Sequence, residues 1–434
     1  MRHVQMNKRR ISPWWGWLLA ACLMTTSAGA ETLQQAWDTA LAVDHGFKAV
    51  QENTAAAAQQ VQAAQAARLP GLDVGAGYTA RDNVPGAATN VGGVPASFPT
   101  GEKNSQSYNA TVTLPLYTSG RISSGIAAAR ASHEAAQLDE SSRSLDLKLR
   151  VAEAFVEVLR AERGLEVADS HVASLEAHVR DVQNRYDQAM VAQNDLLAAQ
   201  VQLADARQES IKAGNRLDIA RAAYNRLLGR PLAQAVSLQE LSPEPVSETL
   251  ETLVARALEQ RSELASLTQQ VQALHRQAKG VRAQSRPQVA LNGGYDYQEN
   301  QYQAHEGQWS ATLGLQWKVF DGGILRHQAG ATEHQAAALQ QQREDLASEI
   351  RLQVRQAWLD VQETRKRIVV TKNAIAQAEE NLTVNRDRYE NSLSTNTEVL
   401  DAETLRTRSQ NNHSNAVYDA VIAVLKLKRA TGEL

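Results

Sequence analysis

The amino-acid sequence predicts a mostly α-helical fold with a small β part, written as two copies of one structural unit. Three observations support this prediction. The 434 residues are 43% hydrophobic but only 5% aromatic, a balance that suits long helices packed through small side chains. Motifs recur at a constant offset, and four short segments alternate between apolar and polar residues. The net charge of −3, without a block of Lys or Arg, predicts no nucleic-acid partner.

Residues 1–30 have the features of a signal peptide. Basic residues precede an apolar run from Trp14 to Met24, and a small-residue site ends at Ala30, after which cleavage is expected. The alternative is lipoprotein processing, because the residues before Cys22 resemble a lipobox, at which this cysteine would be lipidated. Beyond this segment there is no apolar run of about 18 residues, so no helix is predicted to span a bilayer.

The repeat is visible at an offset of 203 residues. Tyr117 matches Phe320 in this register, and VAEAFVEV from Val151 matches VRQAWLDV from Val354. Each copy has the same order: a helical segment, two alternating stretches around a loop, and a very long helical region with one interruption. The predicted units are a first repeat at 31–232, a joining segment at 233–250 and a second repeat at 251–434.

The first helical segment of each copy ends at a proline, Pro70 or Pro287, because proline disfavours helix in the residue before it. The tract 82–104 is rich in Pro and Gly and is predicted to be a loop. The predicted helices are 33–68, 121–186 and 195–229 in the first copy, and 247–285, 324–390 and 397–431 in the second.

The alternating stretches predict four strands, each with one apolar and one polar side. A soluble sheet with one wet face would give the same alternation. A membrane barrel is favoured by strand lengths of about ten residues, by Asn, Thr, Gln and Gly on the polar side, and by aromatics near strand ends. The strands are 71–81, 106–117, 288–298 and 308–320, and the aromatics expected at the lipid interface are Tyr78, Tyr108, Tyr295, Trp309 and Trp317.

Four strands cannot close a barrel, and an open edge in lipid leaves backbone groups without hydrogen bonds. Known membrane barrels start at about eight strands. We therefore expect the chain to pool its strands with copies of itself in lipid. Two copies would supply eight strands and three would supply twelve.

The long helical regions carry heptad seams. Apolar residues recur every seven positions, which demands left-handed coiling against a neighbouring helix. A second seam beside the first predicts neighbours on both sides, as in a wall of helices. A simple dimeric or intramolecular coiled coil is the alternative. The first seam contains Val158, Leu165, Val172, Val179 and Tyr186, and its second-copy equivalent contains Val361, Ile368, Ile375, Leu382 and Tyr389.

The segment NSLSTNT interrupts the second long helical region, and it predicts the tip of a helical hairpin. Glu398 and Asp401 follow it three residues apart, so they share one helix face. Around an assembly axis they would form rings of carboxylates that favour cations. The alternative is that they complement the positive end of the helix dipole.

At this point the sequence resembles the TolC family of outer-membrane exit ducts, in both copies. The resemblance rests on the two hairpin tips and on LPLYTSGR (114–121), VFDGGILR (319–326) and LLGRPL (227–232). It implies a homotrimer with a twelve-stranded outer-membrane β-barrel that continues into an α-helical coiled-coil barrel in the periplasm. The segment 233–250 would then belong to an equatorial belt around the helices.

The resemblance also implies roles for single residues. Glu398 and Asp401 match the acidic positions of the family's periplasmic constriction. Asp195 and Tyr389 match positions at the tips that hold neighbouring coiled coils closed.

Three tip residues depart from the family pattern. Ala189 and Ser392 replace the usual Gly at each tip. We therefore expect that the tips depart from the family's standard turn and from its docking to an adaptor. Ser394 replaces an arginine of the closing network, which predicts weaker closure.

The resemblance implies a passive duct of a tripartite efflux pump or type I secretion system. Its partners would be a periplasmic adaptor and an inner-membrane transporter of the RND, ABC or MFS type. A non-conducting coiled-coil protein of the envelope is the alternative. An enzyme is not expected, since the sequence has no phosphate loop, HExxH or CxxC, and we predict no cofactor or metal. Two histidine pairs are expected to be ordinary seam or solvated residues: His171 and His178, and His327 and His334.

Overall fold

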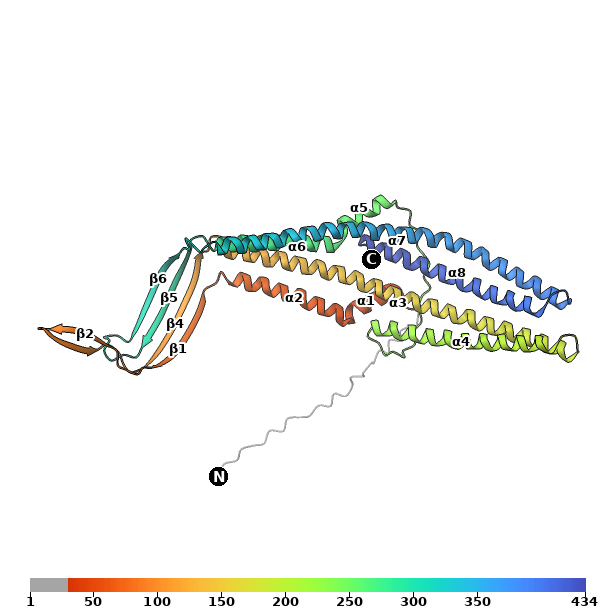
Figure 1. Ribbon diagram of the computed structural model, residues 1–434, viewed down its shortest axis with the longest axis horizontal. Coiled ribbons are helices and arrows are strands. Elements are labelled where there is room, and N and C mark those ends of the chain that lie inside the picture. The colour runs from red at the N-terminus through yellow and green to blue at the C-terminus, as the bar shows by residue number, and fades with distance from the viewer. Residues whose placement is uncertain (1–29) are drawn as a thin grey trace, which may run out of the picture.

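The computed structural model describes residues 30–434. The predicted signal peptide, apart from Ala30, and the predicted lipidation site Cys22 lie outside these residues. The described chain is elongated, with the helices running along its length, a sheet at one end and two helical hairpin tips at the other (Figure 1). The C-terminus lies near the middle of the molecule. In residues 30–434, none of the helices is both long and apolar enough to cross a membrane.

The sheet contains four antiparallel strands, two from each half of the chain. Its strand order is β1 (Gly71–Ala80), β4 (Asn104–Tyr117), β5 (Gln288–Gln298) and β6 (Gly307–Gln316). The two halves are joined by the β4–β5 pair, and β1 and β6 form the edges. Strand 308–320 was predicted too long, because pairing ends at Gln316 and leaves Trp317 beyond the strand.

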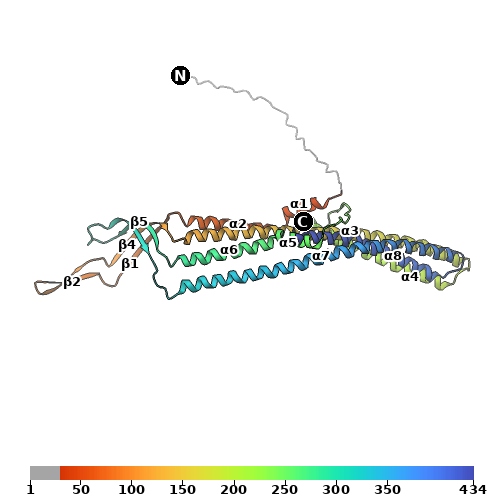
Figure 2. The ribbon, with the colours of Figure 1, turned by 90° about the horizontal axis from the view of Figure 1, so that it is seen from above.

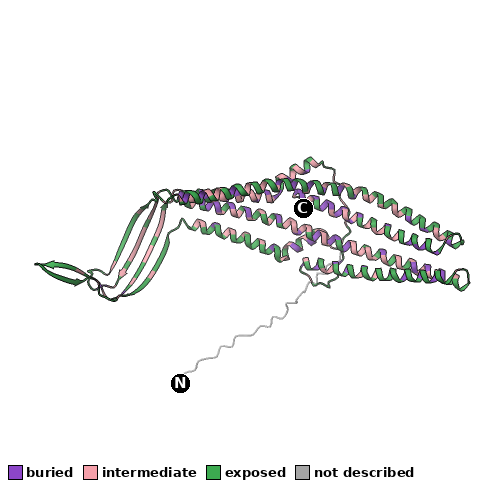
Figure 3. Ribbon diagram, in the orientation of Figure 1, coloured by how far each residue is buried: buried purple, intermediate pink, exposed green. Residues whose placement is uncertain are grey.

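The strand register collects the apolar residues on one face. Val74 lies opposite Ala110, which lies opposite Tyr295, which lies opposite Trp309. The next row places Asp73, Thr111, Gly294 and Ser310 on the other face. Since both faces are largely open to solvent in the single chain, the apolar face lacks a cover within the described residues (Figure 3).

The tract 82–104 is not a loop throughout, so this prediction was wrong. It contains a hairpin of β2 (Gly86–Val91) and β3 (Val94–Pro99) that projects past the sheet (Figure 1). Gly92 and Gly93 have φ values of 61° and 87°, and two successive positive values are what a tight type I′ hairpin turn requires.

The single helices predicted at 33–68 and 247–285 were also wrong, because each is broken in two. The first consists of α1 (Leu33–Val43) and α2 (His45–Ala66), and the second of α5 (Leu250–Gln260) and α6 (Ser262–Ala283). Asp44 adopts an extended conformation, and its carboxylate accepts a hydrogen bond from the Phe47 N–H at 2.7 Å. Arg261 is extended at the second break. The Asp44 side chain thus caps the start of α2, whereas Arg261 makes no side-chain cap at the start of α6.

The four long helices have bounds within two residues of the prediction. They are α3 (Arg121–Asp187), α4 (Gln193–Leu227), α7 (Ile324–Glu390) and α8 (Asn396–Thr431). The 67 residues of α3 span about 100 Å at 1.5 Å per residue. Helices α2, α3, α6 and α7 lie side by side in this order, and α3–α4 and α7–α8 form the hairpins (Figures 1 and 2).

The core is a series of small clusters between helices. The largest surrounds Phe155 of α3 and Tyr224 of α4, whose rings meet edge to face with centroids 5.9 Å apart. A cluster around Val182, Leu196 and Val399 joins the two hairpins near their tips. Buried residues thus lie between the helices, while the sheet contributes few (Figure 3).

Candidate functional site: the hairpin tips

Both hairpin tips use the same turn. Ala189 and Ser392 have φ values of 56° and 59°. The following residues, Met190 and Leu393, donate their N–H groups to the carbonyls of Arg185 and Arg388 at 2.8 and 2.7 Å. This is the Schellman arrangement, in which a left-handed residue ends the helix and is usually Gly. The turn therefore forms here with Ala and Ser in the left-handed position.

The start of α8 places Glu398 and Asp401, the acids predicted for a constriction, on an exposed face. The Thr395 hydroxyl accepts a hydrogen bond from the Glu398 N–H at 3.3 Å and caps the helix. The Ser394 hydroxyl donates to the Glu398 carboxylate. Glu398 and Asp401 are both exposed. Ser394 is thus engaged with one of the acids, at the position where the family resemblance led us to expect weaker closure.

Tyr389 packs on the first hairpin without a hydrogen bond to Asp195. Its ring centroid lies 4.9 Å from the Arg185 guanidinium, which also donates to the carbonyls of Tyr389 and Glu390 at 3.2 and 3.3 Å. Burial raises the pKa of the Tyr389 hydroxyl, and the positive charge of Arg185 opposes this effect. In the described chain this buried hydroxyl has no hydrogen-bond partner.

Asp195 instead acts through its backbone. Its carbonyl accepts a hydrogen bond from the Asn396 side-chain amide at 3.0 Å. The amide oxygen of Asn396 therefore faces the other way and lies 2.7 Å from Nε2 of His178, from which it accepts a hydrogen bond. This chain of contacts links α3, α8 and the start of α4, and the sequence analysis missed it.

About two turns beyond Asn396 on α8, a fully buried carboxylate joins three helices. Glu403 is 0% exposed and accepts hydrogen bonds from the Ser174 hydroxyl of α3 at 2.7 Å and from the Arg386 guanidinium of α7. Arg406 lies 3.2 Å from its second oxygen. The signal in the sequence was the seven-residue spacing of Asn396 and Glu403, two polar residues on one face of a seam helix.

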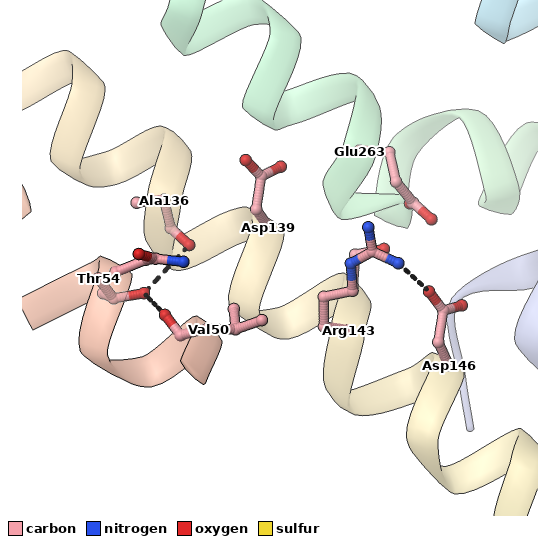
Figure 4. A pocket seen from close by; sticks show the side chains of 9 residues that line it. Val50, Thr54, Ala136, Asp139, Arg143, Asp146 and Glu263 are labelled. Carbon is pink, nitrogen blue, oxygen red and sulfur yellow. Dashed lines mark hydrogen bonds and ion pairs between the residues drawn. The ribbon is translucent and has the colours of Figure 1, made fainter. Parts of the chain in front are cut away.

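A second polar region lies far from the tips, where a cavity of about 500 Å³ opens between α2, α3 and α6 (Figure 4). Two of its carboxylates, Asp146 and Glu263, are paired with one arginine. Asp146 and Glu263 both bind Arg429, at 2.6 and 2.8 Å. The Thr54 hydroxyl contacts the carbonyls of Val50 and Ala136. These contacts join neighbouring helices, which indicates a structural role for the cavity. The hairpin tips are therefore the candidate functional site.

The aromatics predicted for the lipid interface lie at two levels of the sheet. Tyr108 stacks near Tyr297, with ring centroids 5.8 Å apart, and Tyr295 lies 5.1 Å from Trp309. Tyr78 is exposed on the neighbouring strand β1. Trp317 lies at the helical end of the sheet and donates its indole N–H to the Ser285 carbonyl at 3.1 Å.

The fold and the two tips define a class of outer-membrane channel proteins. The family model described as outer membrane efflux protein matches residues 36–230 and 253–433. The chain belongs to this family of outer membrane efflux proteins, and it is an outer-membrane channel-tunnel protein. The family is one of transport channels and not a class of enzymes.

Individual relatives agree with this assignment. The outer membrane protein TolC of Vibrio cholerae is 24% identical over 431 residues, covering 96% of this chain and 94% of that protein. The alkaline protease secretion protein AprF of Pseudomonas aeruginosa is 25% identical over 353 residues, covering 77% of this chain and 71% of that protein. The crystal structure of the outer membrane protein VceC of V. cholerae shares the fold, with a TM-score of 0.76, 18% identity and coverage of 92% and 96% of the two chains.

Proposed function

We propose that three copies of this chain form a passive duct through the outer membrane. The observation that carries this proposal is the four-stranded sheet with two open edges and one apolar face. Three sheets joined from β6 to β1 would close a twelve-stranded barrel and remove every edge. The apolar face would meet lipid, with Tyr78, Tyr108, Tyr295, Trp309 and Trp317 at the interfaces.

Exposed seams on the helices support the same assembly. In α4 and α7, apolar side chains lie on faces that are open in the single chain and are spaced for coiled-coil contact. Their burial against neighbouring copies would extend the barrel into a helical tunnel in the periplasm. These residues are Leu197, Val201, Ile211 and Ile219 on α4, and Leu352, Leu359, Val369 and Val370 on α7.

The tips are the proposed docking end for a periplasmic adaptor and, through it, an inner-membrane transporter of the RND, ABC or MFS type. Met190 and Leu393 stand at the two turns with 62% and 69% of their surface exposed, and exposed apolar residues at such ends favour a protein partner. The family description names efflux and AprF is named for alkaline protease secretion, so we propose efflux or type I secretion as the role of this chain. The energy for transport would come from the transporter.

The proposed constriction is a ring of Glu398 and Asp401 from each copy. In the single chain both acids are exposed on one face of α8, so an axis beside this face would bring six carboxylates together. Such rings concentrate cations and exclude anions. Asp195 and Tyr389 would contribute to closure through the backbone carbonyl and the packed ring described above.

The experiment is a planar-bilayer recording of the purified protein. We expect cation-selective conductance, and loss of most of that selectivity in the Glu398→Gln/Asp401→Asn double variant. Asp205→Asn removes an exposed carboxylate from α4 and serves as the control, with selectivity unchanged. Unchanged selectivity in the double variant would remove these residues from the constriction. A protein that inserts into lipid without conducting, even after these substitutions, would favour the structural envelope protein.

A further inference from the structure

The direction in which the constriction acids point depends on how α8 is rotated about its axis. At 100° per residue, Asn396 and Glu403 lie within about 20° of each other. Glu398 and Asp401 lie, on average, about 180° from that pair on the helical wheel. The exposure agrees, since the first pair is buried and the second exposed. The contacts that hold Asn396 and Glu403 in place therefore also set the direction in which Glu398 and Asp401 point.

Asn396 is held from two sides. It is 3% exposed, donates to the Asp195 carbonyl at the start of α4, and accepts from His178 of α3. An apolar side chain at position 396 could also be buried, but it would make no directed hydrogen bond and would therefore not fix the rotation of α8 about its axis. A buried Asn with two fixed partners specifies one register, as single polar residues do in coiled coils.

Glu403 adds a second fixed point two helical turns away. Its carboxylate meets Ser174 of α3 and Arg386 of α7, so the contact spans both hairpins. Arg386 also donates to the Ser174 hydroxyl at 2.7 Å, which closes a small ring of hydrogen bonds. Two polar contacts on the same helix face resist rotation far better than one.

We propose that Asn396 and Glu403 are positioning residues that keep α8 turned with Glu398 and Asp401 toward the bore, and that protonation of His178 releases this setting. The inference rests on the proposed constriction. The group that takes up the proton is His178, and the cation selectivity of the channel reports the change.

The surroundings of His178 explain why a proton disturbs the contact. The ring is 6% exposed, and its neutral Nε2–H already serves Asn396. The groups that face it are Asp181 on α3, Arg386 and the Tyr389 ring on α7, and Glu403 and Asn396 on α8. A second ring proton would place a buried positive charge beside the Arg386 guanidinium, and the two carboxylates, of which Glu403 is already bound to arginines, offset it only in part.

The sign follows from proton linkage. Burial lowers the pKa of His178, while the hydrogen bond to Asn396 and the charge of Glu403 act in the opposite direction. The packed state therefore binds fewer protons than a released state in which the ring is solvated. As the pH falls below about 6.5, the equilibrium moves toward release.

The test compares three variants at His178 and Asn396 in planar bilayers. His178→Gln keeps an N–H at the place of Nε2 but cannot be protonated. We expect wild-type cation selectivity to fall roughly threefold between about pH 7.5 and about pH 5.5, and the His178→Gln profile to stay flat. Asn396→Leu and His178→Leu should show the reduced selectivity at both pH values. Identical pH profiles for wild type and His178→Gln, or full selectivity in Asn396→Leu, would overturn the proposal.

A thiol readout separates this inference from the constriction itself. Leu405 is 47% exposed and lies on the same face of α8 as the acids, and Leu405→Cys leaves both acids in place. With Cys22→Ala as background, we expect its labelling rate by a charged thiol reagent to change severalfold on acidification or in Asn396→Leu. Unchanged selectivity after removal of both acids would refute the proposed constriction. Equal labelling rates of Leu405→Cys in all conditions would refute the positioning of α8 by Asn396 and Glu403 and its release by protonation of His178.

Discussion

The two hairpin tips have the same backbone turn but different polar residues. Both use a left-handed residue, Ala189 or Ser392, with the same pair of backbone hydrogen bonds. The helices that follow begin differently. Ala192 precedes α4 without a side-chain cap, while Thr395 caps α8 through its hydroxyl.

The difference continues along the first turns of α4 and α8. At the repeat offset, Asp195 corresponds to Glu398. The second acid of α8, Asp401, has no acidic counterpart in α4, and the buried residues Asn396 and Glu403 have no buried counterpart there. The counterparts of Asn396, Asp401 and Glu403 are Gln193, Ala198 and Gln200. The turn thus depends on backbone geometry that two sequences can satisfy, while the buried polar residues Asn396 and Glu403 occur in α8 and have no buried polar equivalent in α4.

The largest expected difference between the tips concerns Glu403. Its replacement by Ala leaves Arg386 and Arg406 without their shared buried partner, which we expect to cost about 3 kcal/mol of unfolding free energy. The matched variant Gln200→Ala changes an exposed residue of α4 and should cost less than about 0.5 kcal/mol. Unfolding followed by far-ultraviolet circular dichroism measures both. Equal effects would refute the difference between the hairpins.

A smaller effect is expected at the helix caps. Thr395→Ala removes the hydroxyl that accepts from Glu398 N–H and should destabilise α8 by about 1 kcal/mol. Ala192 has nearly the same backbone angles, φ −81° and ψ 156°, so Ala192→Thr should add a comparable cap to α4. Hydrogen exchange of the amides in the first turns of α4 and α8 measures the effect of each substitution on its own helix. A loss of protection in Ala192→Thr would contradict the shared geometry.

The smallest effect is expected at the turns themselves. Ala189→Gly and Ser392→Gly relieve a left-handed conformation that costs a side-chain-bearing residue roughly 1 kcal/mol, and the gain is reduced by the greater flexibility of Gly in the unfolded chain. We expect each change to stabilise the protein by about 0.5 kcal/mol. The unfolding midpoint of both variants should rise equally, since the two turns are alike. A decrease at either site would show that its side chain makes a contact that outweighs the strain.

The long helices could be predicted from the sequence because their signals are local and repeated. Heptads, prolines and the polar interruptions fix their ends to within two residues. The breaks at Asp44 and Arg261 were missed, since a single extended residue inside a continuous helical pattern hardly alters its periodicity. The hairpin at 86–99 was missed because its Pro and Gly content outweighed the turn signal of Gly92-Gly93.

The candidate site was predicted only in part. Glu398 and Asp401 could be singled out because they follow a visible interruption. The contacts of Asn396 could not, because its partners His178 and Asp195 are about 200 residues away in the sequence and meet it only after three helices have packed. Their hydrogen bonds are tertiary, and no local pattern encodes them.

The β2–β3 hairpin leaves and re-enters the sheet at adjacent positions, since Ala80 pairs directly with Asn104. Pro95 and Pro99 remove backbone donors from β3, so this ribbon is poorly suited to recruiting additional strands. In the proposed barrel, an insertion between residues 86 and 99 is therefore expected to leave the register of β1 and β4 unchanged.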